Sequence, residues 1–142
     1  MAVTGVRALE RAIDTTNAWI NAMCEVVHTD DRQLAWQGLR STLQVLRDFL
    51  TPEEALDFAA QLPLLLRGAY VDGWRPSHTP VTVRTKAALL ERVGEHLKVP
   101  DYDTERVVRA ALSVVAAHVS AGEVGDVKSL LREEVRALWP SA

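Results

Sequence analysis

The residues best suited to chemistry in this 142-residue chain lie in one short irregular stretch. Loops that combine an aromatic side chain, an acid, an arginine and a histidine often carry binding residues, and Trp and Arg are the side chains most enriched in binding hot spots. In the structural alternative, the side chain of Trp74 packs into the core as a plug, meaning that it fills space between the helices and binds nothing. We favour that linker role over ligand contact, and both interpretations stay open at this point. The candidate binding residues are Tyr70, Asp72, Trp74, Arg75 and His78.

Carboxylates gather where a helix is expected to begin, directly after Thr51 and Pro52. Glu53, Glu54 and Asp57 could bind a metal ion or serve in acid–base catalysis. The alternative is helix capping, in which Thr51 is the N-cap, Pro52 occupies the first helical position and Glu54 reaches back to complete a capping box. Acids in a first turn stabilise a helix by roughly 0.3–1 kcal/mol each. Because the same cap recurs in the second half of the chain, the pattern favours capping.

No catalytic or metal-binding constellation is visible in the sequence. The four histidines are not spaced to share a helix face, and none neighbours Cys24, so a zinc or haem site would need tertiary contacts alone. Phosphate-binding loops, dinucleotide fingerprints and serine nucleophile elbows are absent as well. The sequence therefore predicts no catalytic residue, no metal and no cofactor, and it favours a protein that is not an enzyme. The histidines are His28, His78, His96 and His118.

The second half of the chain repeats the first at a separation of 69 residues, so that Arg40–Tyr70 aligns with Arg109–Trp139. Positions that both copies share are expected to serve packing, whereas a function would be added at positions found in one copy only. The Trp74 loop has no counterpart in the second copy. The shared positions with a structural role are Thr51, Glu54, Asp57 and Arg67 in the first copy and Ser120, Glu123, Asp126 and Arg136 in the second.

Apolar residues recur at helical spacing along most of the chain, and no β-hairpin signal is present. We predict an all-α fold, a helical bundle built from two tandem, duplicated three-helix units that pack face to face in one domain, 1–142. The third helix of the first unit should kink or break at Pro63, whereas the second unit has Arg132 there and should be straighter. Val99-Pro100 should end the first helix of the second unit. The predicted ranges are about 6–70 for repeat one, 71–84 for the linking loop and about 85–139 for repeat two.

Composition and charge limit the classes of partner. The net charge is −3, which argues against nucleic acid as a partner. A nucleic-acid site would need many of the arginines to gather on one face. The single cysteine fits a reducing compartment, and no signal peptide or membrane-length apolar run is visible, so we expect a cytoplasmic protein. Arg outnumbers Lys 13 to 3, which points to a high-GC bacterium as the source. The arginines in question are Arg40, Arg47, Arg75, Arg84, Arg106 and Arg109.

Three separated motifs resemble a known family. The stretch Leu62–Pro76, which reads LPLLLRGAYVDGWRP, the helix start at Thr51–Glu54 and the terminal Glu134–Trp139 all look like bacterial domain-of-unknown-function family 2267 (DUF2267-like). The resemblance covers the chain from about Trp19 onward. It implies a small, all-helical bacterial protein, and it implies no activity.

Two hypotheses for the function follow from these patterns. The first is a non-enzymatic helical interaction or scaffold protein, which binds another protein or a second copy of itself through the Trp74 loop or a groove between the units. The alternative is a small-ligand-binding protein or enzyme with a pocket between the two repeats, near Trp74, Arg75 and His78. In both cases the identity of the partner or ligand stays open.

Overall fold

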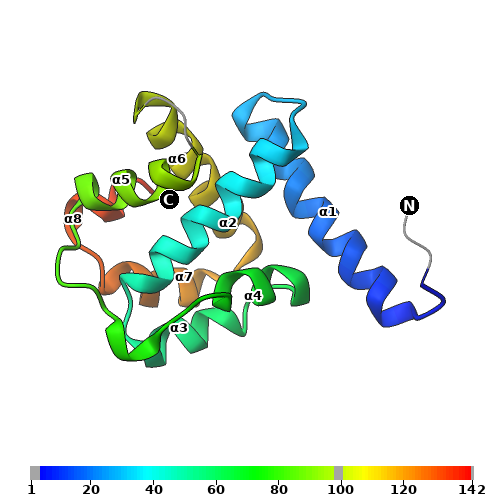
Figure 1. Ribbon diagram of the computed structural model, residues 1–142, viewed down its shortest axis with the longest axis horizontal. Helices are drawn as coiled ribbons and strands as arrows, with labels where there is room; N and C mark the ends of the chain where they lie inside the picture. The colour runs from blue at the N-terminus through cyan, green and yellow to red at the C-terminus, as the bar shows by residue number, and fades with distance from the viewer. Residues whose placement is uncertain (1–3, 98–100, 142) are drawn as a thin grey trace.

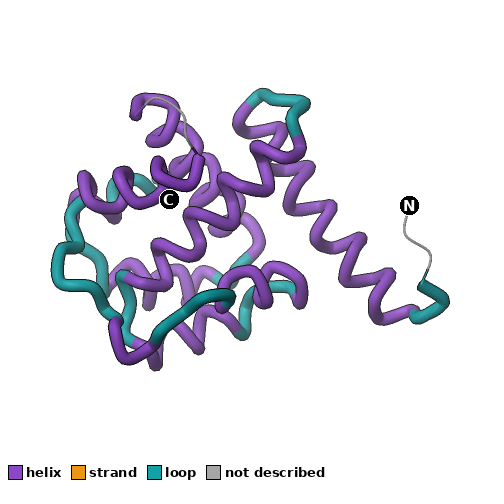
Figure 2. The backbone as a smooth tube through the Cα atoms, in the orientation of Figure 1, coloured by secondary structure: helices purple, strands orange, loops and turns teal. Residues whose placement is uncertain are grey.

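The computed structural model describes residues 4–97 and 101–141, and for residues 101 and 102 it describes the backbone only. Within these ranges the chain consists of helices and connecting turns, without a strand (Figure 2). This confirms the predicted all-α class. The predicted helix stop at Val99-Pro100 lies outside the described residues.

Eight α-helices and one short 3-10 helix follow one another along the described chain (Figure 1). The first half holds α1 to α4, and the second half holds α5 to α8. Between the halves runs an irregular loop that contains the 3-10 helix η1. The bounds are α1 Arg7–Val27, α2 Arg32–Asp48, α3 Pro52–Ala59, α4 Leu64–Val71, η1 Pro76–His78, α5 Lys86–Leu97, α6 Asp101–His118, α7 Ala121–Ser129 and α8 Glu133–Arg136.

The helix predicted as third in each unit is in fact two helices. The chain turns between α3 and α4 and again between α7 and α8, so the described halves hold four helices each instead of three. Pro63 has φ −65° and ψ 157°, and Arg132 has φ −64° and ψ 153°, so both leave the helical region in the same way. The expectation of a straighter helix at Arg132 was therefore wrong. A proline favours this break, but an arginine adopts the same extended backbone at no steric cost.

Both breaks are held by an arginine that donates to backbone carbonyls left free in the turn. Arg67 Nε lies 2.9 Å from the Ala59 oxygen and its Nη2 lies 2.9 Å from the Leu62 oxygen, and Arg136 Nη1 lies 2.5 Å from the Leu131 oxygen. These contacts give both arginines the structural role that is expected of positions shared by the two halves.

The core surrounds α2, which contacts α1, α4, α5 and α6. Residues 41–47 of α2 are buried on every side, as expected of a helix enclosed by others. Gly38 sits where α2 crosses α6, and a Cβ atom added there would lie 2.5 Å from Val107 Cγ1. The absence of a side chain at Gly38 therefore permits the close approach of the two helices.

Candidate functional site

The five candidate binding residues of the loop divide between core and surface. Tyr70 is fully buried, and its hydroxyl donates to the Ala55 carbonyl at 2.9 Å. Burial raises the pKa of this hydroxyl well above its usual range. Trp74 is half-buried and packs against the core, whereas Asp72, Arg75 and His78 are exposed. The packing of Trp74 supports its interpretation as a structural plug, and it leaves Asp72, Arg75 and His78 as the candidate residues exposed to solvent.

Arg47, at the end of α2, anchors this loop. Arg47 is 6% exposed, and its guanidinium donates to the carbonyls of Tyr70 at 2.7 Å and Asp72 at 3.1 Å. Nε also pairs with the Asp48 carboxylate at 2.9 Å. Further along the loop, the Val81 amide donates to the Asp48 carbonyl at 2.9 Å. Both ends of the loop are thus tied to the same turn of α2, which gives an irregular segment a defined shape. Sequence reasoning missed this role because the partners are more than twenty residues from Arg47.

A pocket of about 380 Å³ opens between the end of α2, the loop and α5. Three arginines and one aspartate line it, so its charge is positive. The aspartate is already paired with Arg47. The guanidinium groups of Arg75 and Arg92, by contrast, form no hydrogen bond or ion pair with any residue that the structure describes. The full lining is Arg47, Asp48, Gly73, Arg75, His78, Thr79, Val81 and Arg92.

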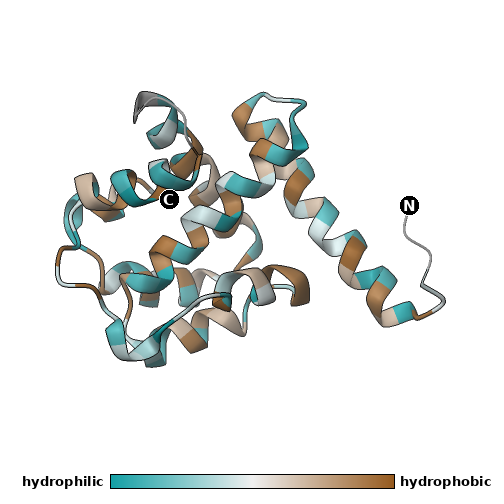
Figure 3. Ribbon diagram, viewed as in Figure 1, coloured by the Kyte–Doolittle hydropathy of each residue, from teal (hydrophilic) through white to brown (hydrophobic). Residues whose placement is uncertain are grey.

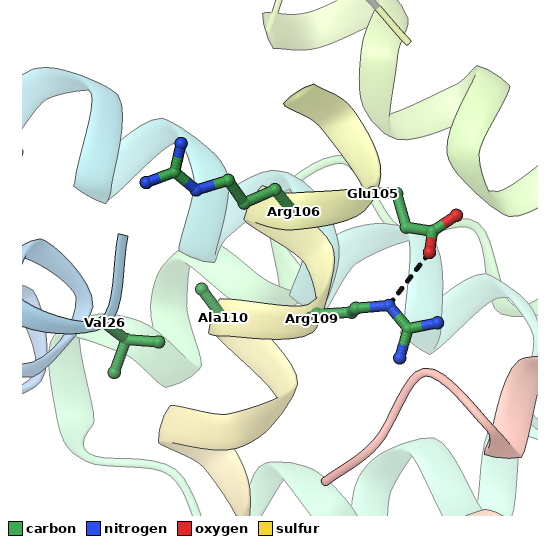
Figure 4. Close-up of a pocket in the computed structure, with 5 residues that line it drawn as sticks. All are labelled: Val26, Glu105, Arg106, Arg109 and Ala110. Atoms are coloured by element: carbon green, nitrogen blue, oxygen red, sulfur yellow. Dashed lines mark hydrogen bonds and ion pairs between the residues drawn. The ribbon is translucent and has the colours of Figure 1, made fainter. Parts of the chain in front are cut away.

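A second, larger pocket of about 560 Å³ lies between α1 and α6, and its cations are engaged within the protein (Figure 4). Arg106 donates to the Val27 carbonyl at 2.6 Å, and Arg109 pairs with Glu105 at 2.9 Å and bonds the Ala137 carbonyl at 3.0 Å. Hydrogen bonds from Lys86 and Arg109 lower the pKa of Glu105. These side chains join α6 to its neighbours and leave little free charge for a ligand.

The six arginines of the nucleic-acid hypothesis are thus divided between separate places. Arg47 and Arg75 line the pocket beside the loop, and Arg106 and Arg109 line the pocket beside α1. Arg84 donates to a backbone carbonyl of the loop at 2.6 Å, and Arg40 lies in α2 with its Nη1 3.5 Å from Gln37 Oε1.

The carboxylates that recur in the two halves meet where α3 packs on α7. Each helix begins as predicted, with Thr51 Oγ1 accepting from the Glu54 amide and Ser120 Oγ accepting from the Glu123 amide, both at 3.2 Å. The Glu54 carboxylate, however, does not reach back to the Thr51 amide, as a full capping box would require. It interacts with the carboxyl group of Glu123 instead. The predicted cap is therefore half correct.

The environment of this pair favours a proton on Glu54. Burial is the largest cause, followed by the hydrogen bond with Glu123 and by the negative charges of Glu123, Asp57 and Asp126, and together they raise the pKa of Glu54 from 4.5 to about 8. Glu54 Oε2 and Glu123 Oε1 are buried, and no donor from another residue reaches either oxygen. Two carboxyl groups so placed can share one proton. No cluster of three or more potential metal ligands occurs among the described residues.

The cysteine and His118 lie against the core. Cys24 is half-buried and packs on core side chains. The ring centroids of His118 and Trp19 lie 4.6 Å apart, and His118 Nδ1 lies 2.7 Å from the Val114 carbonyl oxygen. Both residues therefore have packing partners of their own.

These helices and their buried polar contacts define an all-α helical bundle. The chain belongs to the family described as "Uncharacterized conserved protein (DUF2267)", whose model matches residues 16–138. This confirms the resemblance seen in the sequence motifs. A search of curated proteins finds no match to the chain. In the part of the chain that the structure describes, none of the helices is both long and apolar enough to cross a membrane.

Proposed function

We propose that this protein is a non-enzymatic interaction protein of the bacterial cytoplasm, and that its first partner is a second copy of the same chain. The observation that carries the proposal is the N-terminal end of α1, which extends past the other helices (Figure 1). Residues 4–9 are exposed throughout. They nevertheless include Val6 and Leu9, which are 49% and 45% exposed.

The exposed end of α1 continues the helix face that is buried further along. Ala12, Thr16 and Trp19 are buried against the rest of the protein. Leu9 precedes Ala12 by three residues and Thr16 by seven, so it lies on the same face. The apolar face of α1 thus continues past the point where the other helices cover it. A helix face that is apolar and uncovered is typical of a protein interaction site.

The beginning of α4 adds to this apolar surface. Leu64 and Leu65 are 56% and 43% exposed, and α4 contacts α1. Figure 3 shows the apolar start of α4 on the side of the molecule where α1 lies. A second copy brings an identical apolar surface, so both copies cover their exposed residues in one symmetric contact. Symmetric dimers of this kind are the most common homo-oligomers.

An internal duplication would supply a rigid body for such contacts. Two pairs of residues separated by 69 positions meet in the fold: Gly38 approaches Val107, and Glu54 interacts with Glu123. When a residue contacts the equivalent residue of the other repeat, the contact lies at the two-fold axis that relates the repeats. These pairs support an arrangement of two tandem repeats around a local two-fold axis, with four helices in each repeat.

Light scattering coupled to size-exclusion chromatography tests the proposal. The wild-type protein should elute as a dimer, and Leu9→Asp should elute as a monomer because a charge cannot be buried in the contact. Leu130→Asp is the matched control. Leu130 is the C-cap residue of α7, is 43% exposed and belongs to neither α1 nor α4. A wild-type protein that stays monomeric at its highest soluble concentration, or equal dissociation of both variants, would refute the proposal.

One observation also favours the ligand-binding alternative. The pocket beside the loop contains Arg75, His78 and Arg92, of which the first two were singled out in the sequence. Its volume of about 380 Å³ lies within the range of about 300–1,000 Å³ that small-molecule sites occupy. The chemistry of that pocket allows a more specific inference.

A further inference from the structure

The residues that line the pocket beside the loop do not neutralise its positive charge among themselves. Asp48, the acidic residue in its wall, is paired with Arg47. Arg75 extends from the loop and Arg92 from α5, and neither has an ion-pair partner among the described residues. The lining therefore carries an excess of two positive charges. Uncompensated guanidinium groups that converge on a concave surface from two separate segments form a site for an anion.

The shape and donors of the pocket favour a phosphate group over a carboxylate. A guanidinium presents a planar fork of N–H donors that matches either anion. One guanidinium satisfies both oxygens of a carboxylate, however, whereas a phosphate offers three acceptor oxygens and a second charge. Arg75 and Arg92 together with the exposed ring of His78 provide donors from more than one direction.

The loop is held in place before any ligand arrives. Arg47 bonds the carbonyls of Tyr70 and Asp72, and the Val81 amide bonds Asp48. Thr79 Oγ1 adds a hydrogen bond to the Pro76 carbonyl at 2.9 Å. A pocket wall that is fixed in advance loses less conformational entropy when a ligand binds.

We infer that the pocket formed by the end of α2, the loop after α4 and the exposed face of α5 binds the phosphate group of a small anionic molecule, through Arg75 and Arg92. This inference rests on the ligand-binding alternative described above. It is independent of the self-association through α1, which involves other residues at another place on the molecule.

Isothermal titration calorimetry with inorganic pyrophosphate in a low-salt buffer tests this inference. The variants are Arg75→Gln, Arg92→Gln and the double substitution, and Arg11→Gln is the matched control. Arg11 is exposed on α1, and its replacement removes the same charge away from the pocket. Citrate, a carboxylate anion of similar charge, is titrated in parallel. Thermal melts verify that each variant folds, and Arg75→Gln alters only an exposed loop side chain.

The expected result is that wild type and Arg11→Gln bind pyrophosphate equally well. Loss of one charge-assisted contact should weaken binding roughly tenfold in Arg75→Gln and in Arg92→Gln, and citrate should bind more weakly than pyrophosphate. The inference is overturned if wild type takes up no pyrophosphate, if Arg11→Gln loses as much affinity as the pocket variants, or if citrate binds as tightly. Light scattering on the same samples reports self-association separately, so failure of one proposal is distinguishable from failure of the other.

Discussion

Replacement of Glu54 by Gln should make the protein more stable at pH 8 and flatten the dependence of its stability on pH. The pKa of Glu54 is raised from 4.5 to about 8 by burial and by the neighbouring Glu123. Between these two values, the folded protein holds a proton that the unfolded chain has released. The free energy of unfolding must therefore fall as the pH rises through this window.

The size of this fall in the free energy of unfolding depends on the shift in the pKa of Glu54 and on how exposed Glu54 and Glu123 are. A fully buried group with this shift would lose about 5 kcal/mol across the window. The side chain of Glu54 is only partly buried, and solvent screens the repulsion between the carboxylates. We therefore expect a loss of about 1–2 kcal/mol between pH 5 and pH 8, which corresponds to roughly 3–8 °C in melting temperature. Gln at position 54 stays neutral and should remove most of this loss.

Urea unfolding of wild type, Glu54→Gln and Glu53→Gln at pH 5 and pH 8 measures the effect. Glu53 is exposed and lies in the same first turn of α3, so its replacement removes the same charge from the same helix terminus. Equal stability of the wild type at the two pH values, or an equal change in pH dependence from the two substitutions, would contradict this prediction.

Three further substitutions test the packing. Gly38→Ala should destabilise the protein by about 1–3 kcal/mol, because the added methyl group meets Val107 at 2.5 Å. Gly68→Ala, inside α4 with no atom within 4 Å of the added carbon, should instead stabilise it by about 0.5–1 kcal/mol. Thermal melts of both variants compare them directly, and a gain in both would contradict the close helix crossing. Trp74→Ala should cost about 1–3 kcal/mol, less than a fully buried tryptophan, because Trp74 is half-buried against the core. An unchanged melting temperature would show that the loop does not act as a plug.

Local signals in the sequence were sufficient for the starts of α3 and α7, but not for the contacts that the acidic side chains make there. Thr51 and Ser120 cap their helices as predicted, because an N-cap hydrogen bond depends on residues three positions apart. The direction of the Glu54 carboxylate depends instead on Glu123, 69 residues away. Nothing in either cap indicates that the two acids face one another.

The breaks between α3 and α4 and between α7 and α8 also show that local sequence signals predict only part of the structure. Pro63 revealed the first, because a proline cannot donate to the helix. The second occurs at Arg132, a residue that a helix accepts readily. What the two sites share is a buried leucine before the turn and an arginine that bonds its carbonyl, Leu62 with Arg67 and Leu131 with Arg136. The alignment of the two halves contained these residues, but their contact is visible only in the fold.

The sequence by itself determined the all-α class, the family, the N-caps at Thr51 and Ser120 and the loop that interrupts the helical pattern, since each depends on periodicity, on neighbouring residues or on shared motifs. Tertiary structure alone decided which loop residues reach solvent, because Tyr70 and Trp74 turn toward the core while Arg75 and His78 do not. It also decided that Arg92 of α5 faces the same pocket. Burial and convergence of charge are properties of segments brought together in space, and the spacing of residues along one segment does not contain them.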